Sequence, residues 1–112
     1  MRYVLFLLGA VVALAQDARL EALRNLGKAF YENPTTQKEA AATLKQAYDL
    51  APKSSRERLN YGLALLRAGR AQEAIVELLA VQKEKPELPH TWFTLGIEFL
   101  AAGRRQPIAG QR

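Results

Sequence analysis

The chain has 112 residues, of which 49% are apolar and 24% are charged, and its net charge is +5. This length and composition suit one small globular domain. Cysteine is absent, which excludes disulfides, thiolate nucleophiles, cysteine-based metal sites and a lipid anchor on that residue. The basic residues form no dense run interleaved with aromatic residues, so we expect no nucleic-acid partner.

The first fifteen residues have the pattern of a targeting sequence. A basic start is followed by an apolar run from Tyr3 to Ala15, which is 13 residues long, whereas a helix needs about 20 to cross a bilayer. The run ends in the small-x-small triplet of residues 13–15, a pattern that signal peptidases cut. We therefore expect residues 1–15 to be a signal peptide, with cleavage near Ala15/Gln16, and the mature chain to be periplasmic or secreted, without membrane contact. An uncleaved anchor and a buried N-terminal helix are the alternatives.

Helical periodicity dominates the remaining sequence. Apolar residues at helical spacing predict helices over residues 17–31, 37–50, 56–68, 70–84 and 89–102. The expected N-caps are Asp17, Thr36 and either Ser54 or Ser55. Thr36 should form a capping box with Glu39. We expect residues 16–103 to form one helical domain and residues 104–112 to form an irregular tail.

The helices belong to a repeating unit. Gly27, Gly62 and Gly96 are 35 and then 34 residues apart, and Pro52 and Pro86 are 34 apart. The frame around the last glycine, Trp-x2-Leu-Gly-x2-Phe, occurs in related form around the first two. A fixed period near 34 with this frame resembles the tetratricopeptide repeat family over about residues 20–103. The resemblance implies an all-α, right-handed solenoid of about five helices, with repeats at about 20–54, 55–88 and, in part, 89–103.

The repeat frame also predicts which residues pack the helices together. In each hairpin the glycine is expected to lie where the second helix crosses closely, and Gly69 and Gly103 are expected to end helices. The residues that we expect to serve repeat packing are Leu23, Leu26, Gly27, Phe30, Ala40, Leu44, Ala47, Pro52, Tyr61, Gly62, Leu65, Ala74, Leu78, Val81, Pro86, Trp92, Leu95, Gly96 and Phe99.

The third repeat has a first helix but no pattern for a second one. Repeat arrays usually end in a polar capping helix, so the apolar face of residues 89–102 needs an explanation. Three interpretations compete: a truncated part of a larger exported repeat protein, which we favour, a face covered by a second copy, or a helix that serves as its own cap. The first two predict docking or self-association through the uncapped third repeat.

The resemblance also implies a binding surface, because the first helices of such hairpins line a concave groove. The side chains that should face this groove combine an apolar strip with basic residues near the first repeat, which suits a peptide with an apolar anchor and an acidic end. For Leu59 and Leu63, packing between neighbouring helices is an equally good interpretation. The candidate groove residues are Arg24, Lys28, Tyr31, Arg56, Leu59, Asn60, Leu63, Arg67, His90, Phe93 and Ile97.

Some family members clamp a C-terminal carboxylate with Lys, Asn and Arg side chains. Arg24, Lys28 and Asn60 resemble part of that set, but His90 and Thr94 stand where the last basic pair should be. We therefore do not expect a clamp of this kind.

The sequence offers little for catalysis. His90 is the single histidine, which leaves no histidine pair for a metal, and we interpret it as a surface residue at the groove edge. We expect no catalytic residues, no cofactor and no metal. The predicted function is a non-enzymatic protein–protein interaction module that binds a protein or peptide in the groove. The alternatives are a structural or assembly segment, and the N-terminal repeat segment of an exported enzyme.

Overall fold

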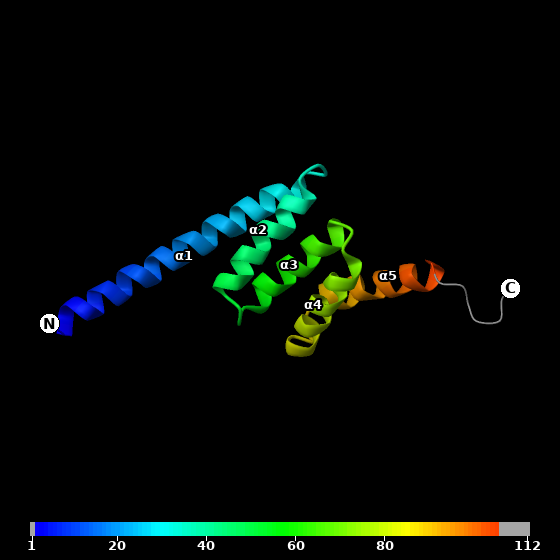
Figure 1. Cartoon of the computed structure of the whole chain (residues 1–112). Coiled ribbons are helices and arrows are strands. Elements are labelled where there is room, and N and C mark those ends of the chain that lie inside the picture. The colour runs from blue at the N-terminus through cyan, green and yellow to red at the C-terminus, as the bar shows by residue number, and fades with distance from the viewer. Residues whose placement is uncertain (1, 106–112) are drawn as a thin grey trace.

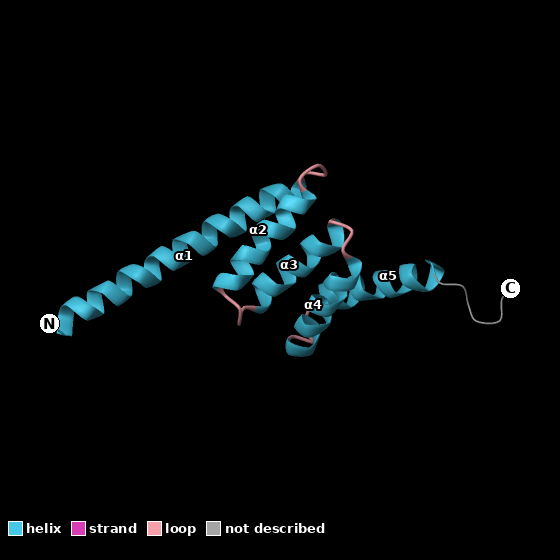
Figure 2. Ribbon diagram, in the orientation of Figure 1, coloured by secondary structure: helices cyan, strands magenta, loops and turns pink. Residues whose placement is uncertain are grey.

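The computed structural model describes residues 2–105, apart from the side chains of residues 2, 3, 99 and 102–105. Over that range the regular structure is entirely helical, as predicted (Figure 2). The helices are α1 (Arg2–Glu32), α2 (Gln37–Leu50), α3 (Ser55–Arg67), α4 (Ala71–Glu84) and α5 (Pro89–Arg105).

Each helix packs against the next one along the chain, from α1 through to α5. α1 and α2 form one antiparallel hairpin, α3 and α4 form a second, and α5 stands alone after them (Figure 1). This stepwise stacking is an α-solenoid, in which each unit is stabilised by its neighbours.

The predicted ends hold for the middle helices, for the end of α1 and for the start of α5, and they fail at the start of α1 and at the end of α5. α2, α3 and α4 begin and end within one residue of the prediction. α1 already begins at Arg2, so Asp17 lies inside a helix and is not an N-cap, because no proline interrupts the Ala- and Leu-rich residues before it. α5 continues through Gly103 to Arg105, since one glycine costs a helix only about 1 kcal/mol. Residues 106–112 of the predicted tail lie outside the described residues.

The caps explain why α3 is bounded so sharply. At its start the Ser54 hydroxyl accepts a hydrogen bond from the Glu57 amide at 3.2 Å. At its end Gly69 adopts φ +81°, and the amides of Gly69 and Arg70 donate to the carbonyls of Leu66 and Leu65 at 3.1 and 2.9 Å. This pair of bonds is a Schellman motif, which favours glycine because of its left-handed backbone.

The predicted cap of α2 takes a different form. Thr36 is the N-cap residue, but its side chain does not cap the helix and the box with Glu39 does not form. Its hydroxyl instead donates to the carbonyl of Phe30 at 2.8 Å, which ties the start of α2 to the end of α1.

The core lies between the two hairpins and extends to α5. Its fully buried large side chains include Leu65, Leu78 and Val81, and Leu44 is 5% exposed. The hairpins close tightly at the predicted glycines. A Cβ at Gly27 would collide with the Leu44 side chain, and one at Gly62 would lie 2.9 Å from Leu78 Cδ2. Small residues at these crossings therefore set the distance between the two helices of each hairpin.

Some predicted packing residues are not buried. Leu26 is 48% exposed, although Tyr61 and Leu95 at the same repeat position are buried. Tyr61 stacks on Tyr48 of the preceding hairpin, with ring centroids 6.1 Å apart, whereas the described residues contain no hairpin before α1. The exposure of Leu26 therefore reflects its place in the first hairpin.

Two packing residues of the third repeat, Trp92 and Gly96, are open for a related reason. Trp92 is 57% exposed. A Cβ at Gly96 would have no atom within 4 Å, because no helix follows α5 in the described residues. The turn residues Pro52 and Pro86 are also exposed, and the Phe99 side chain lies outside the described residues.

Candidate functional site

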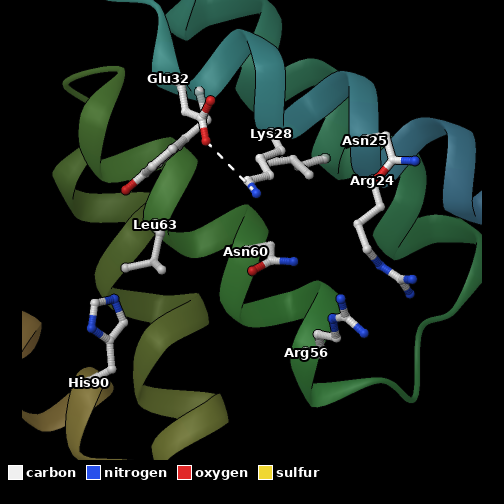
Figure 3. A pocket seen from close by; sticks show the side chains of 10 residues that line it. Arg24, Asn25, Lys28, Glu32, Arg56, Asn60, Leu63 and His90 are labelled. Carbon is white, nitrogen blue, oxygen red and sulfur yellow. Dashed lines mark ion pairs between the residues drawn. The ribbon is translucent and has the colours of Figure 1, made fainter.

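A groove of about 590 Å³ runs along the first helices of the hairpins. Figure 3 shows side chains from α1, α3 and α5 pointing toward this space. Helical spacing explains the convergence, because residues three or four apart share a face. The lining residues are Arg24, Asn25, Lys28, Tyr31 and Glu32 of α1, Leu44 of α2, Arg56, Asn60 and Leu63 of α3, and His90 of α5.

One wall of the groove is held by an ion pair between two hairpins. Arg24 Nε of α1 donates to Glu57 Oε1 of α3 at 2.6 Å, and the Glu57 side chain is only 2% exposed. The Ser54 hydroxyl donates to the other oxygen, Oε2, at 2.9 Å. Burial raises the pKa of Glu57, but the hydrogen bonds from Arg24 and Ser54 outweigh it, so the pKa lies below its ordinary value. Glu57 is therefore a buried anion that fixes Arg24 at the groove.

The remaining charges make the groove positive. Lys28 is 75% exposed and lies 4.0 Å from Glu32, the lone carboxylate among the lining residues, so their attraction is weak. Arg56 of α3 is exposed and also lines the groove (Figure 3). Leu63 and His90 lie at the opposite end of the groove and contribute a less charged surface.

The structure brings seven of the predicted groove residues together: Arg24, Lys28, Tyr31, Arg56, Asn60, Leu63 and His90. Leu59 does not line the groove and packs half-buried against the core. The Arg67 guanidinium stacks on the Tyr31 ring at 4.4 Å and is not among the lining residues. Phe93 and Ile97 are exposed on α5 but do not line the groove either.

Three lining residues were not predicted. Glu32 lies four residues after Lys28, so helical spacing alone could have identified it. Apart from its position next to Arg24, nothing in the sequence indicated that Asn25 would line the groove. Leu44 was assigned to packing alone, and in the structure it both packs over Gly27 and reaches the groove.

The described residues contain no group of three His, Asp or Glu side chains placed to hold a metal ion. His90 is exposed at the groove, as expected. No helix within the described part of the chain combines the length and apolar character that a bilayer span requires.

The repeat architecture is also recognised by comparison with known families. Residues 38–92 match the sequence model of the tetratricopeptide repeat family. No curated protein and no solved structure matches the chain. The matched span contains α2, α3, α4 and the start of α5, which are the helices that stack at the predicted period. Residues 38–92 therefore form tetratricopeptide repeats.

Proposed function

We propose that this chain is a non-enzymatic interaction module that binds an extended or helical peptide of a partner protein in the groove between α1, α3 and α5. Tetratricopeptide repeats generally mediate protein–protein interactions. The observation that carries the proposal is the convergence of Lys28, Arg56, Asn60 and Leu63 on one open groove of about 590 Å³.

The groove favours a peptide that is acidic at one end and apolar at the other. Lys28 and Arg56 offer two cations to a carboxylate side chain, and Arg24 is already oriented by buried Glu57. Leu63 offers an apolar contact, and the Asn60 amide can both donate to and accept from a peptide backbone. Because the cations are near solvent, their attraction should fall with added salt.

Selection of displayed peptides on the immobilised chain tests this proposal. We expect enrichment of peptides that place an acidic residue near an apolar one, and binding that weakens as salt is raised. The double variant Lys28→Glu, Arg56→Glu should lose these peptides. The matched control is Lys38→Glu, Lys83→Glu, which makes the same charge change at exposed residues that do not line the groove. Equal loss in both variants would show nonspecific charge attraction and reject the groove.

We further propose that residues 1–15 are a signal peptide and that the mature chain is exported. Every residue from 4 to 19 is exposed, and this part of α1 extends beyond the hairpin with α2 (Figure 1). Cleavage after Ala15 would therefore remove an apolar helix without removing any side chain of the core. N-terminal sequencing of chain recovered from outside the cytoplasm should start at Gln16. A mature chain that starts at Met1 would contradict the proposal.

A second candidate function is that of a structural or assembly segment, in which α5 docks on another polypeptide. The specific observation that favours it is the open face of α5, where Trp92 is 57% exposed. Trp92→Ala should then abolish association with the polypeptide that docks on α5, while the groove still binds its peptides. Unchanged association of that variant with the docking polypeptide would contradict this candidate function.

A further inference from the structure

The two complete hairpins show how this chain closes a helix crossing. In the first, Leu44 of α2 lies over Gly27 of α1, and in the second, Leu78 of α4 lies over Gly62 of α3. Each leucine has a buried alanine four residues before it, Ala40 or Ala74. Three residues after each leucine comes another buried side chain, that of Ala47 or Val81. Both crossings thus use a glycine on one helix and the pattern Ala-x3-Leu-x2-Ala/Val on the other.

α5 repeats the glycine, but no covering helix lies over it within the described residues. A Cβ at Gly96 would meet nothing within 4 Å. Trp92, one turn before it, is 57% exposed, and Leu100, one turn after it, is 64% exposed. Residues at this spacing form one stripe along a helix. On the opposite side of α5, Thr91 and Leu95 are buried, so the helix is docked and the stripe remains open.

We propose that the stripe of Trp92, Gly96 and Leu100 binds an amphipathic helix of a separate polypeptide that presents Ala-x3-Leu-x2-Ala, with its leucine over Gly96. We infer the sequence pattern of the bound helix from the two crossings within this chain, where helices with that pattern lie over Gly27 and Gly62. A second folded copy cannot supply it, because the helices that carry this pattern, α2 and α4, already bury Leu44 and Leu78 in their own hairpins. The stripe lies outside the groove lining, so this inference deepens the second candidate function and is independent of groove binding.

The residue before the leucine further restricts the sequence of the helix that should bind. In the second hairpin this residue is Glu77, whose carboxylate accepts a hydrogen bond from Arg58 Nε at 2.7 Å. Trp92 holds the repeat position of Arg58, but its indole carries no charge, and its single N–H already donates to the Pro86 carbonyl at 2.8 Å. In the first hairpin the corresponding residues are Leu23 and Thr43, which carry no charge. The bound helix should therefore resemble α2 rather than α4, with an uncharged residue before its leucine.

A synthetic peptide with the sequence of residues 36–51 is the probe, added to the full chain. Trp92 is the single tryptophan of the protein and the peptide has none, so tryptophan emission reports on the stripe alone. We expect a saturable blue shift as the indole leaves water. We also expect a gain in helical circular dichroism, since a peptide of this length is only marginally helical alone.

Two variants and one peptide make the test specific. Gly96→Leu should weaken binding at least tenfold without unfolding the chain, because its side chain enters open space that the peptide leucine would occupy. Leu26→Gln, the control, removes an exposed apolar side chain of α1 and should bind the peptide normally. The peptide carrying Leu44→Asp should not bind. The groove variant Lys28→Glu, Arg56→Glu should bind the helix normally, which separates this inference from groove binding.

Three results would overturn the inference. The first is no emission shift with the peptide, and the second is an equal shift with the Leu44→Asp peptide or with the Gly96→Leu chain. The third is a chain that already self-associates, measured by light scattering, and becomes monomeric in Gly96→Leu, which would make a second copy the occupant.

Discussion

The three repeat glycines should respond differently to the same substitution. Replacing glycine by alanine inside a helix gains about 1 kcal/mol of stability where the methyl group has room. At Gly96 a Cβ meets nothing within 4 Å, so Gly96→Ala should raise the free energy of unfolding by about that amount. At Gly62 the Cβ would lie 2.9 Å from Leu78 Cδ2 and 3.1 Å from its Cγ. Leu78 is fully buried and cannot turn away freely.

The cost at the closed crossings follows from this crowding. Overpacking a core typically costs about 1–3 kcal/mol. After the helix-propensity gain, Gly62→Ala should therefore destabilise the chain by about 0–2 kcal/mol. Gly27→Ala should be worse, because its Cβ would lie 2.6 Å from Leu44 Cγ, closer than the matching contact at Gly62. From most to least stable, the expected order is Gly96→Ala, the parent chain, Gly62→Ala and Gly27→Ala.

Urea unfolding followed by circular dichroism measures these differences, and thermal unfolding should repeat the order. In a domain of this size each kcal/mol shifts Tm by about 4–8 °C. If Gly27→Ala and Gly96→Ala shift stability in the same direction by similar amounts, the difference between closed and open crossings is refuted.

Further predictions concern the ion pair and the caps of α3. Glu57→Gln should lower stability by about 1–3 kcal/mol, because it leaves Arg24 Nε without its anionic partner. Since the pKa of folded Glu57 lies below its ordinary value of 4.5, its contribution is complete above that pH and lost as the pH falls through the folded pKa. Acid titration of unfolding should therefore show a shallower loss in Glu57→Gln than in the parent. Ser54→Ala should cost about 1 kcal/mol by urea unfolding, because the Glu57 amide loses its acceptor. Gly69→Ala should cost about 1–2 kcal/mol, because its φ of +81° is strained for a residue with a Cβ, and an unchanged midpoint would contradict that assignment.

Much of the fold could be predicted because its signals are local. The bounds of α2, α3 and α4 follow from apolar periodicity, turn residues and caps that act within a few positions. The start of α1 and the end of α5 were less predictable, since these ends depend on the absence of strong helix breakers. Asp17 and Gly103 have the chemistry of helix ends, yet the flanking residues sustain the helix past both.

The groove was predicted in part for a similar reason. The resemblance implied that the first helices line the groove, and it placed Lys28, Arg56 and Asn60 beside the packing face of α1 and α3. Whether Arg24 is free or paired depends on Glu57, which is 33 residues away and belongs to the next hairpin. No local pattern reports a contact of that kind.

The sequence by itself determined the repeating unit, the helical hairpins and the glycine crossings at Gly27 and Gly62, because these depend on period, side-chain size and backbone freedom. Only the tertiary structure decided which copies of a repeated residue are buried. Leu26 and Tyr61 hold one repeat position, yet Leu26 is exposed and Tyr61 is buried. The physical reason is that a solenoid unit buries its apolar face only against a neighbour, and the described units at the two ends each lack one.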